Sequence, residues 1–215
     1  MKQWFSKLHD MIDKSDKSIP TMEEIFYNAA KSIFNEKILK IRNIKIELTE
    51  IEFYFFDSKT HNDPFVHQDN LLKDTYNFIY VHKKAWQRGG AGITFGNGSY
   101  KGSILMRGIK HNGSYIAGSA NVKKYLASLI SNDIKEHKQL QEYFYTYQKE
   151  ISLVVSHDKN FTIYRSSRIG LNKDKSQNYA DAKYRFVRED YLLAPKDKNF
   201  LSYSNLKERT KLSLQ

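Results

Sequence analysis

The amino-acid sequence predicts an α+β fold whose sheet is largely antiparallel. Apolar residues recur at helical spacing as far as Phe34, and an alternation with a period of two begins near Ile41. Nine of the ten glycines lie between Gly89 and Gly118, which is typical of short strands joined by tight turns. These observations place helices at the N-terminal end and strands through the middle of the chain.

Two helices are expected before the first strand. The first shows apolar residues at helical spacing, namely Trp4, Phe5, Leu8, Met11 and Ile12. The polar stretch that follows and Pro20 should end this helix. Thr21 with Glu24 three residues later is typical of a capping box, so the second helix is expected to begin there. Its apolar stripe from Ile25 to Phe34 should face the core.

The first long strand, NIKIELTEIEFYFF, changes its apolar face near Thr49. Before this point the even-numbered residues are apolar, and after it the odd-numbered residues are. The change predicts a β-bulge or a strand that is covered on both faces. Glu50, Glu52 and Tyr54 then point to the side that was the core a few residues earlier. A carboxylate placed there is costly unless it has partners or a task.

The remaining elements follow the same patterns. A strand is expected over residues 103–109, with Ile104 and Met106 on one face and Leu105 and Arg107 on the other. Residues 120–150 have helical periodicity, and ISLVVS and FTIYRS are predicted strands. The segment SNLKERTKL near the C-terminal end is a predicted helix.

Composition limits the possible functions. The 215 residues fit one domain, 21–215, with 1–20 as an N-terminal helical extension. The 35 Lys and Arg against 24 Asp and Glu give a net charge of +11. This surplus indicates nucleic acid or an anionic membrane surface as partner, or a compositional drift without a partner. The absence of cysteine excludes disulfides, thiolate zinc sites and cysteine nucleophiles.

The sequence shows no sign of membrane insertion or export. No stretch approaches 18 apolar residues, and the N-terminal segment lacks the apolar run of a signal peptide. We therefore expect a cytoplasmic protein without a membrane partner. The glycine-rich region contains neither a P-loop nor a dinucleotide-binding motif, and no serine-nucleophile motif is present. Phosphate-loop and acyl-transfer chemistry are therefore unsupported.

Two groups of residues could carry chemistry. His61, Asp63 and His67 lie close together in the sequence and could bind a metal ion, although their geometry is undetermined. Glu52 could instead act as a general base toward water if His67 and Arg107 share its pocket, because the cation and the imidazole would hold and tune the carboxylate.

The order of these motifs resembles the alkyladenine (3-methyladenine) DNA glycosylases. A helix leads into ELTEIEFY, where two glutamates bracket one residue and a tyrosine follows. Asp63 precedes His67 by four residues, IYVH ends in His82, and SILMRGI contains Arg107. The RIG segment, an RF pair and LSYS follow near the C-terminal end. The matches run from about residue 25 to 206. The resemblance implies a curved, open-barrel-like, mostly antiparallel sheet flanked by helices.

The resemblance also implies site residues. Glu52 would be the general base that activates water, and Arg107 would hold the active-site water network and the nucleic-acid backbone. The substrate-binding residues would be Tyr54, His67, His82 and Thr94, with Thr94 replacing an asparagine of the family. The residues expected to contact nucleic acid are Trp86, Arg88 and Arg168. Trp86 is the only aromatic residue near the position of the family's intercalating tyrosine.

Three functions are therefore open. The first is a monomeric N-glycosylase that acts on a flipped damaged or modified base in DNA, without cofactor or metal. The second is a nucleic-acid-binding module on the same fold without hydrolysis. The third is a metal-dependent hydrolase that uses His61, Asp63 and His67. The motifs with which the family binds DNA are altered in this sequence, which favours a changed substrate.

Overall fold

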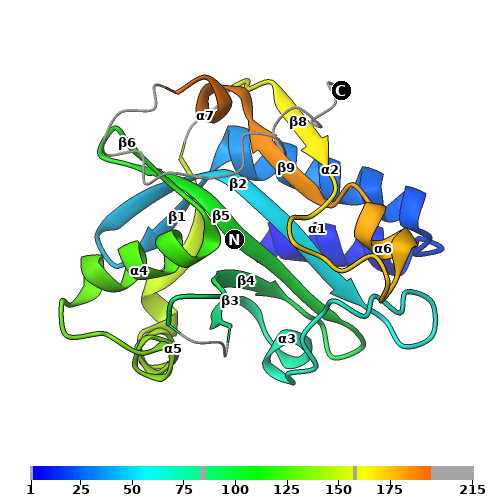
Figure 1. The fold of residues 1–215 in the computed structure, drawn as a ribbon, viewed down its shortest axis with the longest axis horizontal. Helices are drawn as coiled ribbons and strands as arrows, with labels where there is room; N and C mark the ends of the chain where they lie inside the picture. The colour runs from blue at the N-terminus through cyan, green and yellow to red at the C-terminus, as the bar shows by residue number, and fades with distance from the viewer. Residues whose placement is uncertain (1, 83–85, 157–158, 195–215) are drawn as a thin grey trace.

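The computed structural model describes residues 2–82, 86–156 and 159–194. A curled antiparallel sheet forms a half-barrel, with helices packed around it (Figure 1). The α+β class and the open-barrel-like sheet predicted from the sequence are thus confirmed. None of the helices within these ranges is both long enough and apolar enough to cross a membrane.

The sheet is built around the long antiparallel pair β2 and β5. The main strand order is β3-β4-β5-β2-β1-β7, with β6 added to β5, β9 to β2 and β8 to β9. The strands are β1 (Lys37–Ile41), β2 (Ile44–Phe56), β3 (Tyr76–Val81), β4 (Ala91–Phe95), β5 (Lys101–His111), β6 (Ser114–Ala117), β7 (Ile151–Val155), β8 (Ile163–Ser166) and β9 (Arg185–Arg188).

The helices differ from the sequence prediction mainly at their ends. They are α1 (Lys2–Asp13), α2 (Ile19–Glu36), α3 (Leu71–Asp74), α4 (Ser119–Ile130), α5 (His137–Thr146), α6 (Gln177–Asp181) and α7 (Glu189–Leu193), with a 3₁₀ turn η1 (Gln148–Glu150). The helical pattern of 120–150 is therefore interrupted between α4 and α5. The short helices α6 and α7 were not predicted. The expected helix SNLKERTKL and the LSYS match lie outside the described residues.

The predicted start of the second helix at Thr21 is wrong. The N-cap of α2 is Ser18, whose Oγ accepts a hydrogen bond from the Thr21 backbone N–H at 3.4 Å. Pro20 lies in the first turn, where a helix does not need its missing N–H, so proline starts this helix rather than separating two elements.

The N-terminal helix α1 belongs to the main hydrophobic core. Phe5, Leu8 and Ile12 are each at most 1% exposed and join the same buried cluster as Phe26 of α2 and Phe53 of β2. Figure 1 shows α1 and α2 together behind the sheet. Helix α1, which lies in the segment 1–20 expected as an extension, therefore contributes to the packing of the core.

The predicted β-bulge is present at Thr49 of β2, but it keeps Leu48 and Phe53 in the same core cluster. The expectation that Glu52 and Tyr54 point to the side of the earlier core is therefore wrong. Leu48 pairs with Ile109 of β5, but Glu50 already pairs with Gly108, so Thr49 has no opposite residue. Beyond the bulge, Phe53 packs against Phe26 of α2 with ring centroids 4.5 Å apart. The neighbouring residues Glu52 and Tyr54 consequently point to the face opposite α2.

Gly108 makes room for this bulge, and we expect Gly108→Ala to destabilise the fold. An added Cβ would lie 2.7 Å from Thr49 Oγ1 and 2.9 Å from Glu50 Cβ, so backbone or buried side chains must shift. Overpacking of this kind costs about 1–3 kcal/mol. A urea-unfolding midpoint equal to that of the parent would show that the bulge accommodates the added methyl group without loss of stability.

Candidate active site

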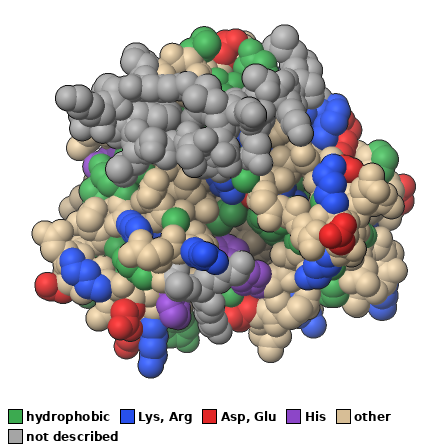
Figure 2. All heavy atoms as spheres, in the orientation of Figure 1, with side chains coloured by type: hydrophobic (Ala, Val, Ile, Leu, Met, Phe, Trp, Pro, Cys, Tyr) green, Lys and Arg blue, Asp and Glu red, His purple; other side chains and the backbone are tan. Residues whose placement is uncertain are grey.

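A cavity of about 460 Å³ opens on the face of the sheet opposite α2. Four of the predicted site residues line it: Tyr54, His67, His82 and Arg107. They come from β2, the segment before α3, the end of β3 and β5. Figure 2 shows histidine side chains in a hollow near the middle of this face, with Lys and Arg side chains close by. Tyr54, His67 and Arg107 thus converge on one pocket, whereas Glu52, which was expected to share it, does not line the cavity.

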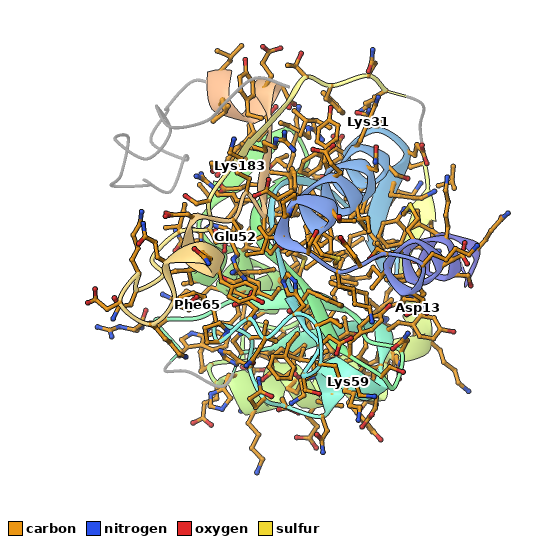
Figure 3. All side chains as sticks on the ribbon, turned by 90° about the vertical axis from the view of Figure 1, so that its right-hand side faces the viewer. Asp13, Lys31, Glu52, Lys59, Phe65 and Lys183 are labelled. Atoms are coloured by element: carbon orange, nitrogen blue, oxygen red, sulfur yellow. The ribbon has the colours of Figure 1, made fainter. Side chains whose placement is uncertain are left out.

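Glu52 lies directly behind this cavity and is 0% exposed. Its Oε1 accepts a hydrogen bond from the Ile169 backbone N–H at 2.8 Å and lies 3.3 Å from Arg107 Nε. Its Oε2 accepts a hydrogen bond from the Tyr54 hydroxyl at 2.9 Å. Figure 3 shows Glu52 in the interior, on the side of the cavity-lining Phe65 and away from Asp13 of α1. Tyr54 and Arg107 line the cavity and contact Glu52, so these two residues connect the carboxylate with the cavity.

Arg107 bridges two buried carboxylates. Its Nε lies 3.2 Å from Glu50 Oε1 and 3.3 Å from Glu52 Oε1. Burial alone would lower the pKa of Arg107, but the two carboxylates hold that pKa above its ordinary value. The same Glu50 oxygen accepts a hydrogen bond from Arg185 Nε at 2.8 Å. Burial opposes the charge of Glu50, yet Arg185 and Arg107 keep its pKa below the usual range.

Tyr54 separates the cavity from a buried arginine. The guanidinium carbon of Arg168 lies 4.6 Å from the Tyr54 ring centroid, and Arg168 does not line the cavity. One ring face is therefore covered by a cation, and the residue presents the rest of its ring to the cavity. Burial and the adjacent Glu52 carboxylate raise the pKa of Tyr54, so its hydroxyl stays protonated and donates to Glu52.

Arg168, expected to contact nucleic acid, is unavailable for that role. Its side chain is 0% exposed and pairs with the equally buried Asp63 at 2.7 Å. The Nη1 atom that faces Asp63 also donates to the Phe53 carbonyl at 3.4 Å, and Nη2 donates to the Tyr179 carbonyl at 2.9 Å. Arg168 instead anchors the segment in which the next residue, Ile169, donates its backbone N–H to Glu52.

Rings from three residues form one wall of the cavity region. The His67 and His82 rings are 4.6 Å apart and nearly perpendicular, and Tyr80 lies 5.2 Å from His82 in a similar arrangement. The Tyr80 hydroxyl also donates to Asp69 at 3.4 Å. Edge-to-face packing of this kind fixes the orientation of both imidazoles.

Thr94 does not line the cavity as expected. It is 0% exposed, and its hydroxyl accepts hydrogen bonds from the Thr75 hydroxyl at 3.0 Å and the Phe78 backbone N–H at 3.2 Å. Both contacts tie the start of β3 to β4. Thr94 is therefore a structural residue, and the sequence could not reveal this because its partners lie on a neighbouring strand.

Trp86 and Arg88 lie on the segment that leads to the cavity-lining Gly89 and Gly90. Trp86 is half-buried against the core, and Lys123 Nζ lies 5.0 Å from its ring centroid. The Lys123 ammonium also donates to the Arg88 carbonyl at 2.7 Å, whereas the Arg88 side chain is exposed. Arg88 therefore remains accessible near the cavity, while Trp86 contributes to packing.

The three candidate metal ligands are not assembled into a metal site. The His61 ring nitrogen Nδ1 lies 2.8 Å from the Lys17 carbonyl, Asp63 pairs with Arg168, and His67 faces the cavity. Burial lowers the pKa of His61, which favours its neutral form. Within the described ranges, no group of three or more His, Asp or Glu side chains could hold a metal ion. This arrangement does not favour the metal-dependent hydrolase.

Sequence reasoning missed several groups at this site. Ser103 and Lys175 line the cavity, and the Ile169 N–H and Arg185 complete the contacts of the two glutamates. Ser103 could have been found, because it shares the strand face of Arg107 at an even spacing. A backbone N–H leaves no such signal in a sequence.

No protein-family model matches the chain. One relative, from a mimivirus, aligns with most of the chain. This protein of Acanthamoeba polyphaga mimivirus, named "Uncharacterized protein L759", is 29% identical over 197 residues. The match covers 77% of the present chain and 86% of the viral protein. The name of this relative states no activity, so the functional proposal rests on the chemistry of the site.

Proposed function

We propose that the protein is a divergent DNA glycosylase that hydrolyses the N-glycosidic bond of a flipped damaged or modified base. The observation that carries this proposal is the buried Glu52 carboxylate, fixed by Arg107, Tyr54 and a backbone N–H behind a cavity walled by aromatic and imidazole rings. Base flipping needs such a cavity, because stacking there offsets the few kcal/mol spent on unstacking the base.

The carboxylate has the capacity to act on a water molecule. Two carboxylate oxygens offer about four lone-pair sites, and the contacts with Ile169, Arg107 and Tyr54 use three of them. The fourth lies on Oε2, beside the Tyr54 hydroxyl. A water bound there would give a proton to Glu52 as its oxygen attacks the anomeric carbon and the N-glycosidic bond breaks. The departing base would take up a proton from solvent, to which Glu52 later returns its own. Positive charge that develops on the sugar would be stabilised by the same carboxylate in a dry site.

The charge distribution supports a nucleic-acid partner. We propose that the protein binds this partner as a monomer. The net charge is +11, and Arg88 and Lys175 are exposed cations at or beside the cavity. Such cations attract phosphates without reading sequence. The proposed hydrolysis uses only side chains and water, so neither cofactor nor metal enters it.

Mass spectrometry of free bases tests this proposal. Single- and double-stranded oligonucleotides carrying hypoxanthine, 3-methyladenine or ethenoadenine are incubated with the full chain, with and without EDTA. We expect release of at least one base, at the same rate with EDTA as without it. Binding of the oligonucleotides without release of any base would overturn the proposal.

The second candidate is a nucleic-acid-binding module without hydrolysis. It is favoured by one observation, that Glu52 is 0% exposed and does not itself line the cavity. This function predicts oligonucleotide affinity that falls with salt according to the number of phosphates neutralised, with no free base in the same samples. The panel above therefore separates the two candidates directly.

A further inference from the structure

Ser103 of β5 carries a buried hydroxyl that has no hydrogen-bond partner among the residues that the structure describes. The residue lines the cavity although it is only 1% exposed, so it lies at the cavity's deep end. Its Oγ makes no hydrogen bond with any group in the described parts of the chain. Buried polar atoms in proteins are nearly always hydrogen-bonded, so an orphaned hydroxyl facing a cavity indicates a ligand.

The strand register explains why this hydroxyl faces the cavity. Ser103 pairs with Tyr54 of β2 and with Thr94 of β4. It shares its strand face with Leu105 and Arg107, both of which also line the cavity. The neighbouring Thr94 hydroxyl bonds with Thr75 and with the Phe78 backbone N–H, and it makes no hydrogen bond with Ser103.

The surroundings of Ser103 make its hydroxyl selective. Other lining residues with little exposure include the apolar Val66, Leu72 and Leu105 and the cationic Arg107, all at most 7% exposed. The Ser103 hydroxyl adds one donor and two acceptor lone pairs at a fixed place among them. A ligand that cannot use it leaves the hydroxyl unpaired, and sites of this kind discriminate strongly against such ligands.

We propose that the Ser103 hydroxyl hydrogen-bonds an exocyclic oxygen or amino group of the nucleobase held in the cavity. The cavity then selects bases whose exocyclic oxygen or amino group is free, such as hypoxanthine. It disfavours bases that carry hydrogen at this position, such as unsubstituted purine. This inference rests on the proposed function for its ligand class, a nucleobase, but it does not depend on hydrolysis.

Equilibrium binding of two nucleosides to the full chain tests the inference. Inosine carries the exocyclic oxygen, and purine riboside has hydrogen in its place. Isothermal titration calorimetry should give about tenfold tighter binding of inosine to the parent protein. Ser103→Ala should remove this difference by weakening inosine alone. Ser103→Cys, which keeps the size with a weaker hydrogen-bonding group, should reduce it.

Ser152→Ala is the matched control, because Ser152 is also buried in a strand of the same sheet but does not line the cavity. It should keep the parental ratio of the two affinities. Equal affinities in the parent, an unchanged ratio in Ser103→Ala, or no binding of either nucleoside at millimolar concentration would each overturn the inference.

The failures of the two proposals are distinguishable. A selective affinity for inosine that Ser103→Ala abolishes, without base release from any oligonucleotide, would support the role of Ser103 and overturn the hydrolysis. Base release from an oligonucleotide, together with equal affinities for inosine and purine riboside, would support the hydrolysis and overturn the role of Ser103.

Discussion

Glu52→Gln is expected to slow base release by about 10²–10⁴-fold, the contribution of a positioned general base. The affinity for the same oligonucleotide should remain close to that of the parent, because Glu52 is 0% exposed and does not line the cavity. Single-turnover release followed by mass spectrometry gives the rate, and fluorescence anisotropy gives the affinity.

The amide is a suitable replacement because it fits the existing contacts. Its oxygen can still accept the hydrogen bond from the Ile169 N–H, and its NH₂ group can donate to the Tyr54 hydroxyl oxygen. It cannot take up a proton from water at neutral pH. A loss of release without a loss of binding therefore reports the chemistry of the carboxylate.

Glu142→Gln controls for the removal of a negative charge. Glu142 lies on α5 and its side chain is exposed, away from the cavity lining. This variant should release base at the parental rate. If Glu52→Gln also released base at that rate, Glu52 would not be the general base, even if the protein proved to be a glycosylase.

Arg168→Met is expected to lower the free energy of unfolding by about 3–5 kcal/mol, because it leaves a fully buried carboxylate without its cation. Arg168 and Asp63 are both 0% exposed and lie 2.7 Å apart. The methionine also removes the donors that satisfy two backbone carbonyls. Urea denaturation followed by circular dichroism measures the change.

Arg165→Met is the matched control, because Arg165 pairs with Glu24 at the same distance of 2.7 Å but at an exposed carboxylate. Its loss should cost less than about 1 kcal/mol. Adding Asp63→Leu to Arg168→Met should recover part of the stability, since no buried charge is then left unpaired. Equal losses for the two single arginine variants would show that burial does not set the strength of the Arg168 pair.

The residues of β2 and β5 were predictable from the sequence because strand alternation is a local property. The alternation placed Glu52 and Tyr54 on one face of β2 and Arg107 with Leu105 on one face of β5, and the structure shows that these two faces lie on the same side of the sheet, opposite the core. Arg168 was misassigned because its partner Asp63 lies in a distant segment, and no local pattern shows that the two meet.

The misplaced start of α2 has a different cause. Ser18 and Thr21 both have the chemistry of an N-cap, and propensity alone does not choose between them. Tertiary packing and the tolerance of the first turn for Pro20 decide in favour of Ser18. Roles that depend on neighbours from other strands, such as those of Thr94 and Ser103, likewise become visible only when the sheet is assembled.

The bulge at Thr49 decides which face of β2 the site residues occupy, in a way that residue identity does not reveal. If β2 instead alternated regularly from Leu48 onward, Glu50, Glu52 and Tyr54 would turn toward the hydrophobic core and Phe53 would turn toward the cavity. A relative that kept every one of these residues but paired regularly at this point would therefore lose the site. A homologue without the extra residue would reach the same arrangement by regular alternation, so the spacing here is as informative as the two glutamates themselves.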